Sequence, residues 1–246
     1  KQLEQLKEKE YLERFKQCRS NNFSTNLGRD LKIIKKIFNN KKKGVFVEVG
    51  GNDGTTGSYS LLLEKDFAWN GVCIEASPWL FEKMKRTRSC ICEQTALGQS
   101  FSKEEFYNFP GQLNQINGLK KHFRNNNNFQ QHLKRSIHNV IDVNLIPFSE
   151  LTKKHNINQI DFFVIDVEGA EFEVIKGIDF DNTRIDVFLI EQATKEIKIF
   201  LTSKGFKDVM KINNDTLFIH NKSEQFYNLG IPSSSGSKLK YSLKRI

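Results

Sequence analysis

Short apolar runs and helically spaced apolar positions alternate along most of this chain. The β-branched or aromatic runs predict strands over 45–49, 71–75, 89–97, 139–143, 161–167 and 186–191. Apolar residues at helical spacing predict helices over 30–38, 58–65, 79–86, 147–154, 172–176 and 195–204. Two last strands, over 206–212 and 215–220, flank a turn and predict an antiparallel hairpin. Alternation of strands and helices predicts parallel βαβ units, and therefore an α/β, Rossmann-like, doubly wound sheet that is mostly parallel.

The same pattern divides the chain into segments. Residues 1–22 predict a charged helical extension or linker, and 23–221 hold the α/β domain. Within that domain, 112–136 is a polar insertion rich in Asn, Gln, His and Lys, which we expect to lie over the site as a substrate lid. Residues 222–246 predict a basic, flexible tail. Because the chain starts with a charged helical pattern, we interpret it as part of a longer multidomain polypeptide.

Charge and composition narrow the choice of partners only a little. The net charge of +9 is compatible with a nucleic-acid partner, an acidic substrate, a nucleotide-linked donor or a membrane surface. No aromatic and basic interleaving of the RNA-binding type, zinc finger or helix-turn-helix pattern supports the first of these. No apolar run approaches the roughly 20 residues of a membrane helix, so we predict no transmembrane segment.

The four cysteines, Cys18, Cys73, Cys90 and Cys92, show no C-x-x-C spacing. We interpret them as reduced, mostly buried thiols rather than as a zinc site or disulfides. Reduced thiols predict a cytosolic, that is cytoplasmic, protein.

The stretch GVFVEVGGNDG, residues 44–54, joins a buried strand to a glycine turn. A dinucleotide fingerprint starting at Gly50 would need glycines where Asn52 and Thr55 stand. The turn instead places a carboxylate, Glu48, beside glycines such as Gly54 that let a ligand approach the backbone. A carboxylate repels phosphate and attracts an ammonium or sulfonium group, and S-adenosylmethionine carries both. Glu48 is therefore expected either to receive the ammonium or to hold the loop through hydrogen bonds.

Further acidic residues follow the other strands, where an α/β sheet forms its ligand crevice. Glu75 ends the second strand about 20 residues after the glycine turn, where an acid commonly accepts both ribose hydroxyls. Asp166 and Glu168 follow the central strand and Glu191 the next one. One of these acids is a candidate general base, and together they are a candidate set for a divalent metal. The alternative for Glu168 is capping of the following helix.

One histidine of the insertion, His122, is a further candidate for deprotonating a hydroxyl. A histidine in a polar loop is more often an ordinary surface residue. The candidate catalytic residues are therefore Asp166, Glu191 and His122.

Taken together, these motifs resemble the FkbM family of S-adenosylmethionine-dependent O-methyltransferases. The resemblance rests on FVEVGGNDG (46–54), LEKDFAWNGVCIEASP (63–78), TALG (95–98), IDFFVIDVEGAEFEVIKGIDF (160–180) and IEQ (190–192). It implies a seven-stranded class I methyltransferase sheet with the C-terminal hairpin, an adenine contact near Thr95 and Ala96, and Asp166 beside the reacting groups. The candidate cofactor residues are Glu48, Gly50, Asn52, Gly54, Glu75, Ala76, Thr95, Ala96 and Asp166. Gly51 and Asp53 depart from the usual G-A-N-x-G form of the family's loop.

The resemblance implies methyl transfer to a hydroxyl, and we expect the acceptor to be a sugar in a carbohydrate or glycoconjugate. The polar insertion has no counterpart in the motifs, so the resemblance does not extend to the acceptor. Two alternatives stay open: an RNA methyltransferase, favoured by the net charge, and a noncatalytic interaction domain that keeps the fold.

Overall fold

The computed structural model describes residues 29–109, 116–123, 133 and 138–227. The predicted N-terminal extension, most of the tail and much of the polar insertion lie outside these residues. None of the helices in the described part combines the length and apolar character that a membrane crossing requires.

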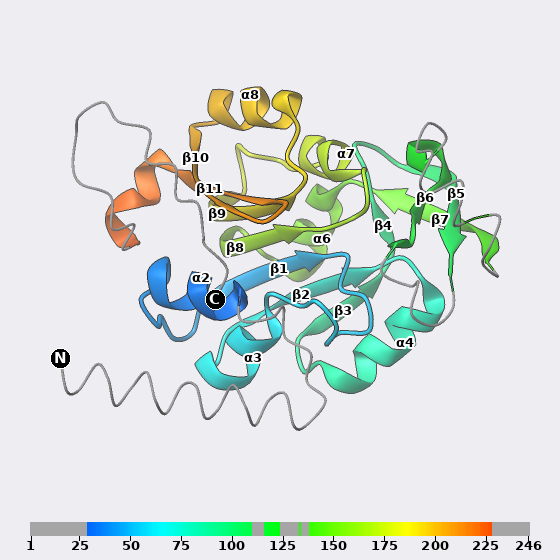
Figure 1. Cartoon of the computed structure of the whole chain (residues 1–246), viewed down its shortest axis with the longest axis horizontal. Helices are drawn as coiled ribbons and strands as arrows, with labels where there is room; N and C mark the ends of the chain where they lie inside the picture. Colours follow the sequence, from blue (N-terminus) through cyan, green and yellow to red (C-terminus); the bar gives the residue numbers. More distant parts are fainter. Residues whose placement is uncertain (1–28, 110–115, 124–132, 134–137, 228–246) are drawn as a thin grey trace.

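A seven-stranded sheet forms the centre of the molecule (Figure 1). Its strands lie in the order β10-β11-β9-β8-β1-β2-β3. Their bounds are β1 (Val45–Val49), β2 (Asn70–Glu75), β3 (Ile91–Gln94), β8 (Gln159–Ile165), β9 (Arg184–Glu191), β10 (Phe206–Ile212) and β11 (Asp215–His220). Strands β9, β8, β1, β2 and β3 run parallel, whereas β11 pairs antiparallel with both β9 and β10. The predicted α/β class is confirmed, and the sheet is mixed.

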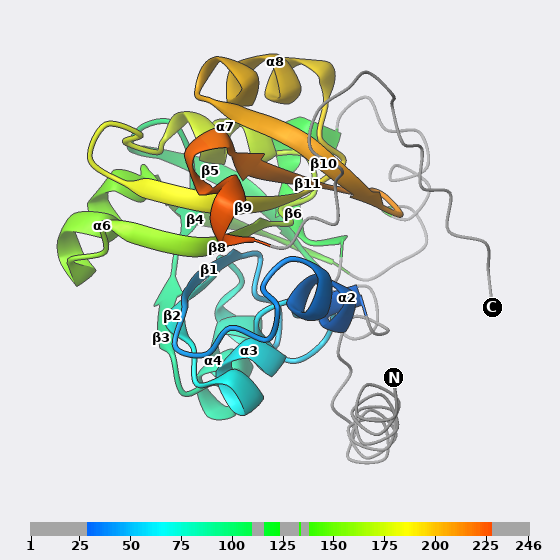
Figure 2. The ribbon, with the colours of Figure 1, turned by 90° about the vertical axis from the view of Figure 1, so that its left-hand side faces the viewer.

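Helices cover both faces of this sheet (Figure 2). They are α2 (Arg29–Lys36), α3 (Leu61–Phe67), α4 (Pro78–Thr87), α6 (Phe148–His155), α7 (Glu171–Lys176) and α8 (Lys195–Ser203), with 3₁₀ turns η2 (Lys120–Phe123) and η3 (Asn221–Phe226). Alternate residues of one strand reach opposite faces. In β1, Phe46 packs in the core with α2 and α3, whereas Val47 and Val49 pack in the core with α6, α7 and α8. Burial on both faces explains why the central strands are almost wholly apolar.

A second, smaller sheet lies beside the carboxyl ends of the parallel strands (Figure 1). Its order is β4-β7-β5-β6, with bounds β4 (Ala96–Leu97), β5 (Ser102–Asn108), β6 (Gly118–Leu119) and β7 (Asn139–Ile146). The single strand predicted over 89–97 was wrong, because the chain leaves the main sheet after Gln94 and enters the small sheet at Ala96. The strand predicted over 139–143 exists, but it pairs antiparallel with β5 instead of joining the main sheet.

The sequence patterns did not predict β5, whose residues SKEEFYN are mostly exposed except at Phe106 and Tyr107. A strand with one solvated face carries too few apolar residues to stand out. Two short elements of the predicted insertion, β6 and η2, also belong to this part of the structure. The small sheet therefore supplies a wall next to the crevice at the ends of the main strands.

Candidate active site

A cavity of about 440 Å³ opens where the main and small sheets meet. Most of the candidate site residues line it: Glu48, Gly50, Asn52, Glu75, Ala76, Thr95, Ala96, Asp166, Glu168 and Glu191. Gly54 and His122 are not among its lining residues. Residues at the ends of five parallel strands, β1, β2, β3, β8 and β9, thus converge on one crevice, as expected at the carboxyl ends of a parallel sheet.

Gly50 brings the turn after β1 against the end of β8. It has a φ of +85°, and a Cβ placed on it would lie only 1.8 Å from the carbonyl oxygen of Asp166. The Gly50 and Gly51 amides both donate to the carbonyl of Ile74, at 3.0 and 2.9 Å. This turn is therefore hydrogen-bonded to β2 on one side and packed against β8 on the other, and only glycine fits at position 50.

Asn52 and Asp53 shape the next part of the loop. Asn52 is also left-handed, with a φ of +50°, and its amide donates to Glu75 Oε2 at 2.8 Å. The Asp53 carboxylate accepts from the amides and hydroxyls of Thr55 and Thr56 at 2.7 to 2.9 Å. Burial raises the pKa of Asp53, but the hydrogen bonds from Thr56 and Thr55 outweigh it and hold the pKa below its usual value.

Gly54 serves packing against α4 rather than the cavity wall. Its φ is +83°, and an added Cβ would lie 2.5 Å from Thr87 Oγ1 and 2.9 Å from Arg88 Cγ. We expected Gly54 among the cofactor contacts, and its observed role is to let the loop approach α4 closely.

Glu48 anchors the loop through both of its carboxylate oxygens. Oε1 accepts from the Tyr59 amide at 2.7 Å, and Oε2 accepts from the Ser58 and Ser60 hydroxyls at 2.7 and 2.6 Å. Arg88 Nη1 donates to the same Oε2 at 3.2 Å. Of the two roles that the sequence left open for Glu48, the hydrogen bonds support holding the loop.

Arg88 is a buried cation that the sequence analysis did not single out. Its guanidinium donates to Glu64 Oε2 at 2.6 Å, to Ser60 Oγ at 2.7 Å and to the Gly54 carbonyl at 3.3 Å. Its side chain is 0% exposed, so these partners compensate a fully desolvated charge. Arg88 ties α3, α4 and the loop after β1 to Glu48. One basic residue at the end of a helix gives no sequence signal of this role.

Glu75 lies at the end of β2 beneath the loop, only 6% exposed. Its two oxygens accept from the amides of Asn52 and Ser77, both at 2.8 Å. Burial raises the pKa of Glu75 to about 7, although the hydrogen bonds from Ser77 and Asn52 act in the opposite direction. Each oxygen keeps acceptor capacity toward the cavity, because a carboxylate oxygen has two lone pairs.

Asp166, Glu168 and Glu191 lie close together at the ends of β8 and β9. One carboxylate oxygen from each lies within 4.8 Å of the others. Burial, followed by the charge and hydrogen bonding of Glu191, raises the pKa of Asp166 well above its usual range. Burial and the charges of Glu191 and Glu171 raise the pKa of Glu168 to about 8. Three such groups cannot all be ionised easily unless a proton or another cation is shared among them.

The N-cap of α7 is Ala170, with no side-chain capping hydrogen bond, so the structure does not support the helix-capping alternative for Glu168. Glu171 Oε1 accepts from the amides of Gly169 and Val167, at 3.0 and 3.3 Å. Glu168 has a φ of +56° and is followed by Gly169 at +105°. This left-handed pair turns the chain sharply after β8 and leaves the Glu168 carboxylate at the cavity.

His122 lies on η2, next to the turn after β8 but outside the cavity lining. Its Nε2 is 3.3 Å from Glu173 Oε1, and its Cβ lies 3.2 Å from the position that a Cβ on Gly169 would take. Burial lowers the pKa of His122 even though Glu173 raises it. The Glu173 carboxylate of α7 is thus a polar neighbour of the imidazole.

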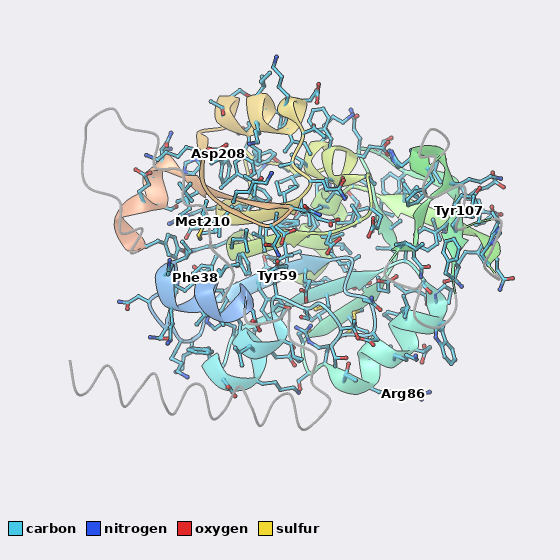
Figure 3. The ribbon with its side chains drawn as sticks, in the orientation of Figure 1. Phe38, Tyr59, Arg86, Tyr107, Asp208 and Met210 are labelled. Carbon is cyan, nitrogen blue, oxygen red and sulfur yellow. The ribbon has the colours of Figure 1, made fainter. Side chains whose placement is uncertain are left out.

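Several lining residues were missed by the sequence analysis: Tyr59, Phe106, Asn117, Leu119 and Asp215. The Tyr59 hydroxyl donates to Asp215 Oδ2, which joins the loop after β1 to the start of β11. Figure 3 shows Tyr59 in the interior, between the strands and α2. Asn117 and Leu119 come from the polar insertion, so part of that insertion does border the cavity. Only the tertiary contacts reveal these residues, since no local motif surrounds them.

The cavity is strongly acidic although the chain is basic overall. Six carboxylates line it, those of Glu48, Glu75, Asp166, Glu168, Glu191 and Asp215. Among the described residues that line the cavity, none is Lys, Arg or His. Such a cavity favours a ligand that carries positive charge or many hydroxyl donors over one that carries phosphates.

Comparison with known proteins agrees with the motifs. Residues 48–224, well over half of the chain, match the family model of the methyltransferase FkbM domain. A comparison with curated protein sequences finds no match.

Three solved methyltransferase structures are similar to the chain at low identity. Methyltransferase FkbM from Methylobacillus flagellatus KT shares 12% identity, with 74% of this chain and 44% of that chain covered and a TM-score of 0.42. Precorrin-6y C5,15-methyltransferase from Geobacter metallireducens GS-15 shares 10% identity, with 73% and 80% covered and a TM-score of 0.34. Human methyltransferase 10 domain containing protein shares 13% identity, with 73% and 72% covered and a TM-score of 0.36. The chain thus spans less than half of the FkbM protein from Methylobacillus.

Proposed function

This chain belongs to the FkbM methyltransferase family, and we propose that it transfers the methyl group of S-adenosylmethionine to a hydroxyl of a sugar, in a glycan or glycoconjugate. The observation that carries the proposal is the glycine turn, which is held between β2 and β8 and opens onto an acid-lined cavity. In this proposal the mixed sheet is the class I methyltransferase arrangement, and residues 23–221 form the catalytic domain.

The cofactor lies across the ends of β1, β2 and β3 in this proposal. Glu75 accepts hydrogen bonds from the ribose hydroxyls with the lone pairs that the Asn52 and Ser77 amides leave free. Ala76, Thr95 and Ala96 contact the adenine, and the backbone at Gly50 and Asn52 faces the methionine part. The positions of these residues in one cavity support the assignment. Glu48 acts by holding the loop, and Gly54 by its packing on α4.

Asp166 is the proposed general base, with Glu191 beside it. The hydroxyl oxygen attacks the sulfonium methyl in line, the carbon–sulfur bond breaks, and the hydroxyl proton passes to the Asp166 carboxylate. Burial and Glu191 raise the pKa of Asp166, which makes its ionised form a stronger base than an exposed aspartate. Alignment of oxygen, methyl and sulfur supplies most of the remaining rate enhancement. His122 has no part in this scheme, because it is not among the residues that line the cavity.

A divalent cation is the second arrangement that the same carboxylates support. Oxygen ligands suit Mg²⁺ or Mn²⁺, and one oxygen each from Asp166, Glu168 and Glu191 lies within 4.8 Å of the others. A cation held there would lower the pKa of the acceptor hydroxyl and replace the need for a base. Activity that survives exhaustive chelation, with no stimulation by added Mg²⁺ or Mn²⁺, would contradict this arrangement.

The lining of the cavity supports a sugar acceptor over RNA. Most protein contacts to nucleic acid go to phosphate, and Arg and Lys provide many of them. The acidic lining suits a ligand with several hydroxyl donors instead. The RNA alternative rests on the net charge of +9, but none of the described residues that line the cavity is Lys, Arg or His.

Methyl transfer from labelled S-adenosylmethionine to matched panels of free sugars, glycans and RNA tests this function. We expect label in a carbohydrate, and loss of transfer in Asp166→Asn with cofactor binding retained. The matched control is Asp142→Asn, which changes an exposed carboxylate on β7. Label in RNA alone, with a steep dependence on salt, would replace the sugar by RNA. Absence of cofactor binding would leave the noncatalytic interaction domain as the better account.

A further inference from the structure

Among the described residues, three thiols lie on or next to the neighbouring strands β2 and β3, close to the loop after β1, and the proposed function uses none of them. Cys73 is buried in the middle of β2, whereas Cys90 and Cys92, at the start of β3, are partly buried. The strand register places Cys73 directly beside Cys92, and Cys90 is two residues earlier, on the same face of the sheet. The Cys90 and Cys73 Sγ atoms lie 3.6 Å apart.

Cys73 contacts Glu48, the residue that holds the loop after β1. Its Sγ is 3.8 Å from Glu48 Oε2 and 3.9 Å from Ser60 Oγ. A Cβ placed on Gly51 would lie 3.6 Å from Cys73 Cβ, so this thiol lies directly under the glycine turn. A displacement of Cys73 would therefore disturb Gly51 at the start of the loop, as well as Glu48 and Ser60, which hold its far end.

Cys90 is linked to Glu48 through the backbone that leads to Arg88. It is two residues beyond Arg88, whose guanidinium holds Glu48, Gly54 and Ser60. Glu64 on α3 fixes this segment by accepting from Arg88 Nε and from the Ser89 amide, both at 2.6 Å. A movement of Cys90 toward β2 therefore pulls on the residues that position Arg88.

We propose that Cys73 and Cys90 form a reversible disulfide that loosens the loop after β1 and weakens binding of S-adenosylmethionine. A disulfide has an S–S length of about 2.05 Å, so the two sulfurs must approach from 3.6 Å by about 1.5 Å. The approach displaces Cys73 from Glu48 and draws Cys90 away from the segment clamped by Glu64. The effect on the cofactor rests on the proposed function, whereas the disulfide itself does not.

The chemistry needs a peroxide as oxidant. The Cys90 thiolate attacks one peroxide oxygen, the O–O bond breaks, and Cys90 becomes a sulfenic acid as the other oxygen leaves as hydroxide or alkoxide, which takes a proton from water. The Cys73 sulfur then attacks the Cys90 sulfur, the disulfide forms, and the sulfenic oxygen leaves as water. Hydrogen bonding to the Cys73 and Cys92 thiols and the charge of Arg88 lower the pKa of Cys90 to about 3, which favours the thiolate. A dithiol reverses the reaction.

The test uses the full chain with Cys18→Ser, which removes the thiol outside the described residues. The protein is treated with hydrogen peroxide, and the linkage is mapped by mass spectrometry of peptides without reduction. We expect a Cys73–Cys90 bond that dithiothreitol removes, and that also forms in Cys92→Ser. No disulfide, or a bond from Cys73 to Cys92, would overturn the proposal.

Two further readouts test the effect on the loop. By calorimetry, oxidation should weaken S-adenosylmethionine binding by about tenfold or more, the factor that corresponds to about 1.4 kcal/mol. Cys90→Ser should bind equally before and after peroxide. Amide hydrogen exchange over 50–60 should accelerate on oxidation, and this readout needs no cofactor. Failure of the reduced chain to bind the cofactor would refute the proposed function alone, whereas a mapped disulfide with unchanged exchange would refute the switch.

Discussion

Substitution of Gly50 has a cost in folding free energy that can be worked out from the structure. An alanine there must adopt a φ of +85° and place its Cβ 1.8 Å from the Asp166 carbonyl oxygen. The left-handed conformation costs a non-glycine residue about 1–2 kcal/mol. Crowding in a packed interior adds about 1–3 kcal/mol, because the turn and β8 must separate. We therefore expect Gly50→Ala to lower the free energy of unfolding by about 2–5 kcal/mol.

Gly57→Ala is the matched control for the conformational part of this cost. Gly57 has a φ of +75°, but a Cβ on it would have no heavy atom within 4 Å. Its substitution should cost only the backbone term, about 1–2 kcal/mol. The difference between the two variants isolates the close approach of the turn to β8.

Urea unfolding followed by circular dichroism measures both free energies, and thermal unfolding checks their order. Gly50→Ala should also lose affinity for S-adenosylmethionine, because the displaced turn lines the cavity. Equal destabilisation by the two substitutions would refute the argument that position 50 requires glycine for packing as well as for φ.

Three further predictions follow from individual contacts. Arg88→Met should lower the free energy of unfolding, measured in urea, by about 3–5 kcal/mol, because it leaves the buried carboxylates of Glu48 and Glu64 without their cation. Arg86→Met, at an exposed position in the last turn of α4 (Figure 3), should be nearly neutral. The pKa of Glu75 is raised to about 7, so its protonated form favours folding below about 4.5 and this stability is lost as the pH rises to 7; Glu75→Gln should remove that part of the measured pH dependence. Tyr59→Phe removes the donor that joins the loop after β1 to Asp215 on β11, and should weaken S-adenosylmethionine binding, which calorimetry measures.

Local patterns predicted the parts of the fold that local chemistry determines. The runs around Val47 and Phe163 are apolar because both faces of their strands are covered, so they read clearly as strands. The strand β5 (Ser102–Asn108) has a solvated face and gave no such signal. The departure of the chain from the main sheet after Gln94 depends on pairing with the distant β7, which no local window contains.

The site residues also fall into those that local patterns predicted and those that depend on long-range contacts. Acids that follow strands, such as Glu75 and Asp166, were found because the sheet brings strand ends together whatever the intervening sequence. Arg88 and Asp215 were missed because their roles depend on long-range contacts, with Glu48 and Tyr59 respectively. Glu48 itself was identified from its position, but only its partners distinguish an anchor of the loop from a ligand for an ammonium group.

Calorimetric titration of the reduced chain with S-adenosylmethionine tests the central claim most directly. We predict saturable binding at one site, weakened by about tenfold or more in Glu75→Gln, which removes a charged acceptor from the ribose. The Asp142→Asn control should bind like the original chain, because its carboxylate is exposed on β7. No heat of binding for the folded, reduced chain, or equal affinity in Glu75→Gln, would contradict the account of this cavity as the cofactor site.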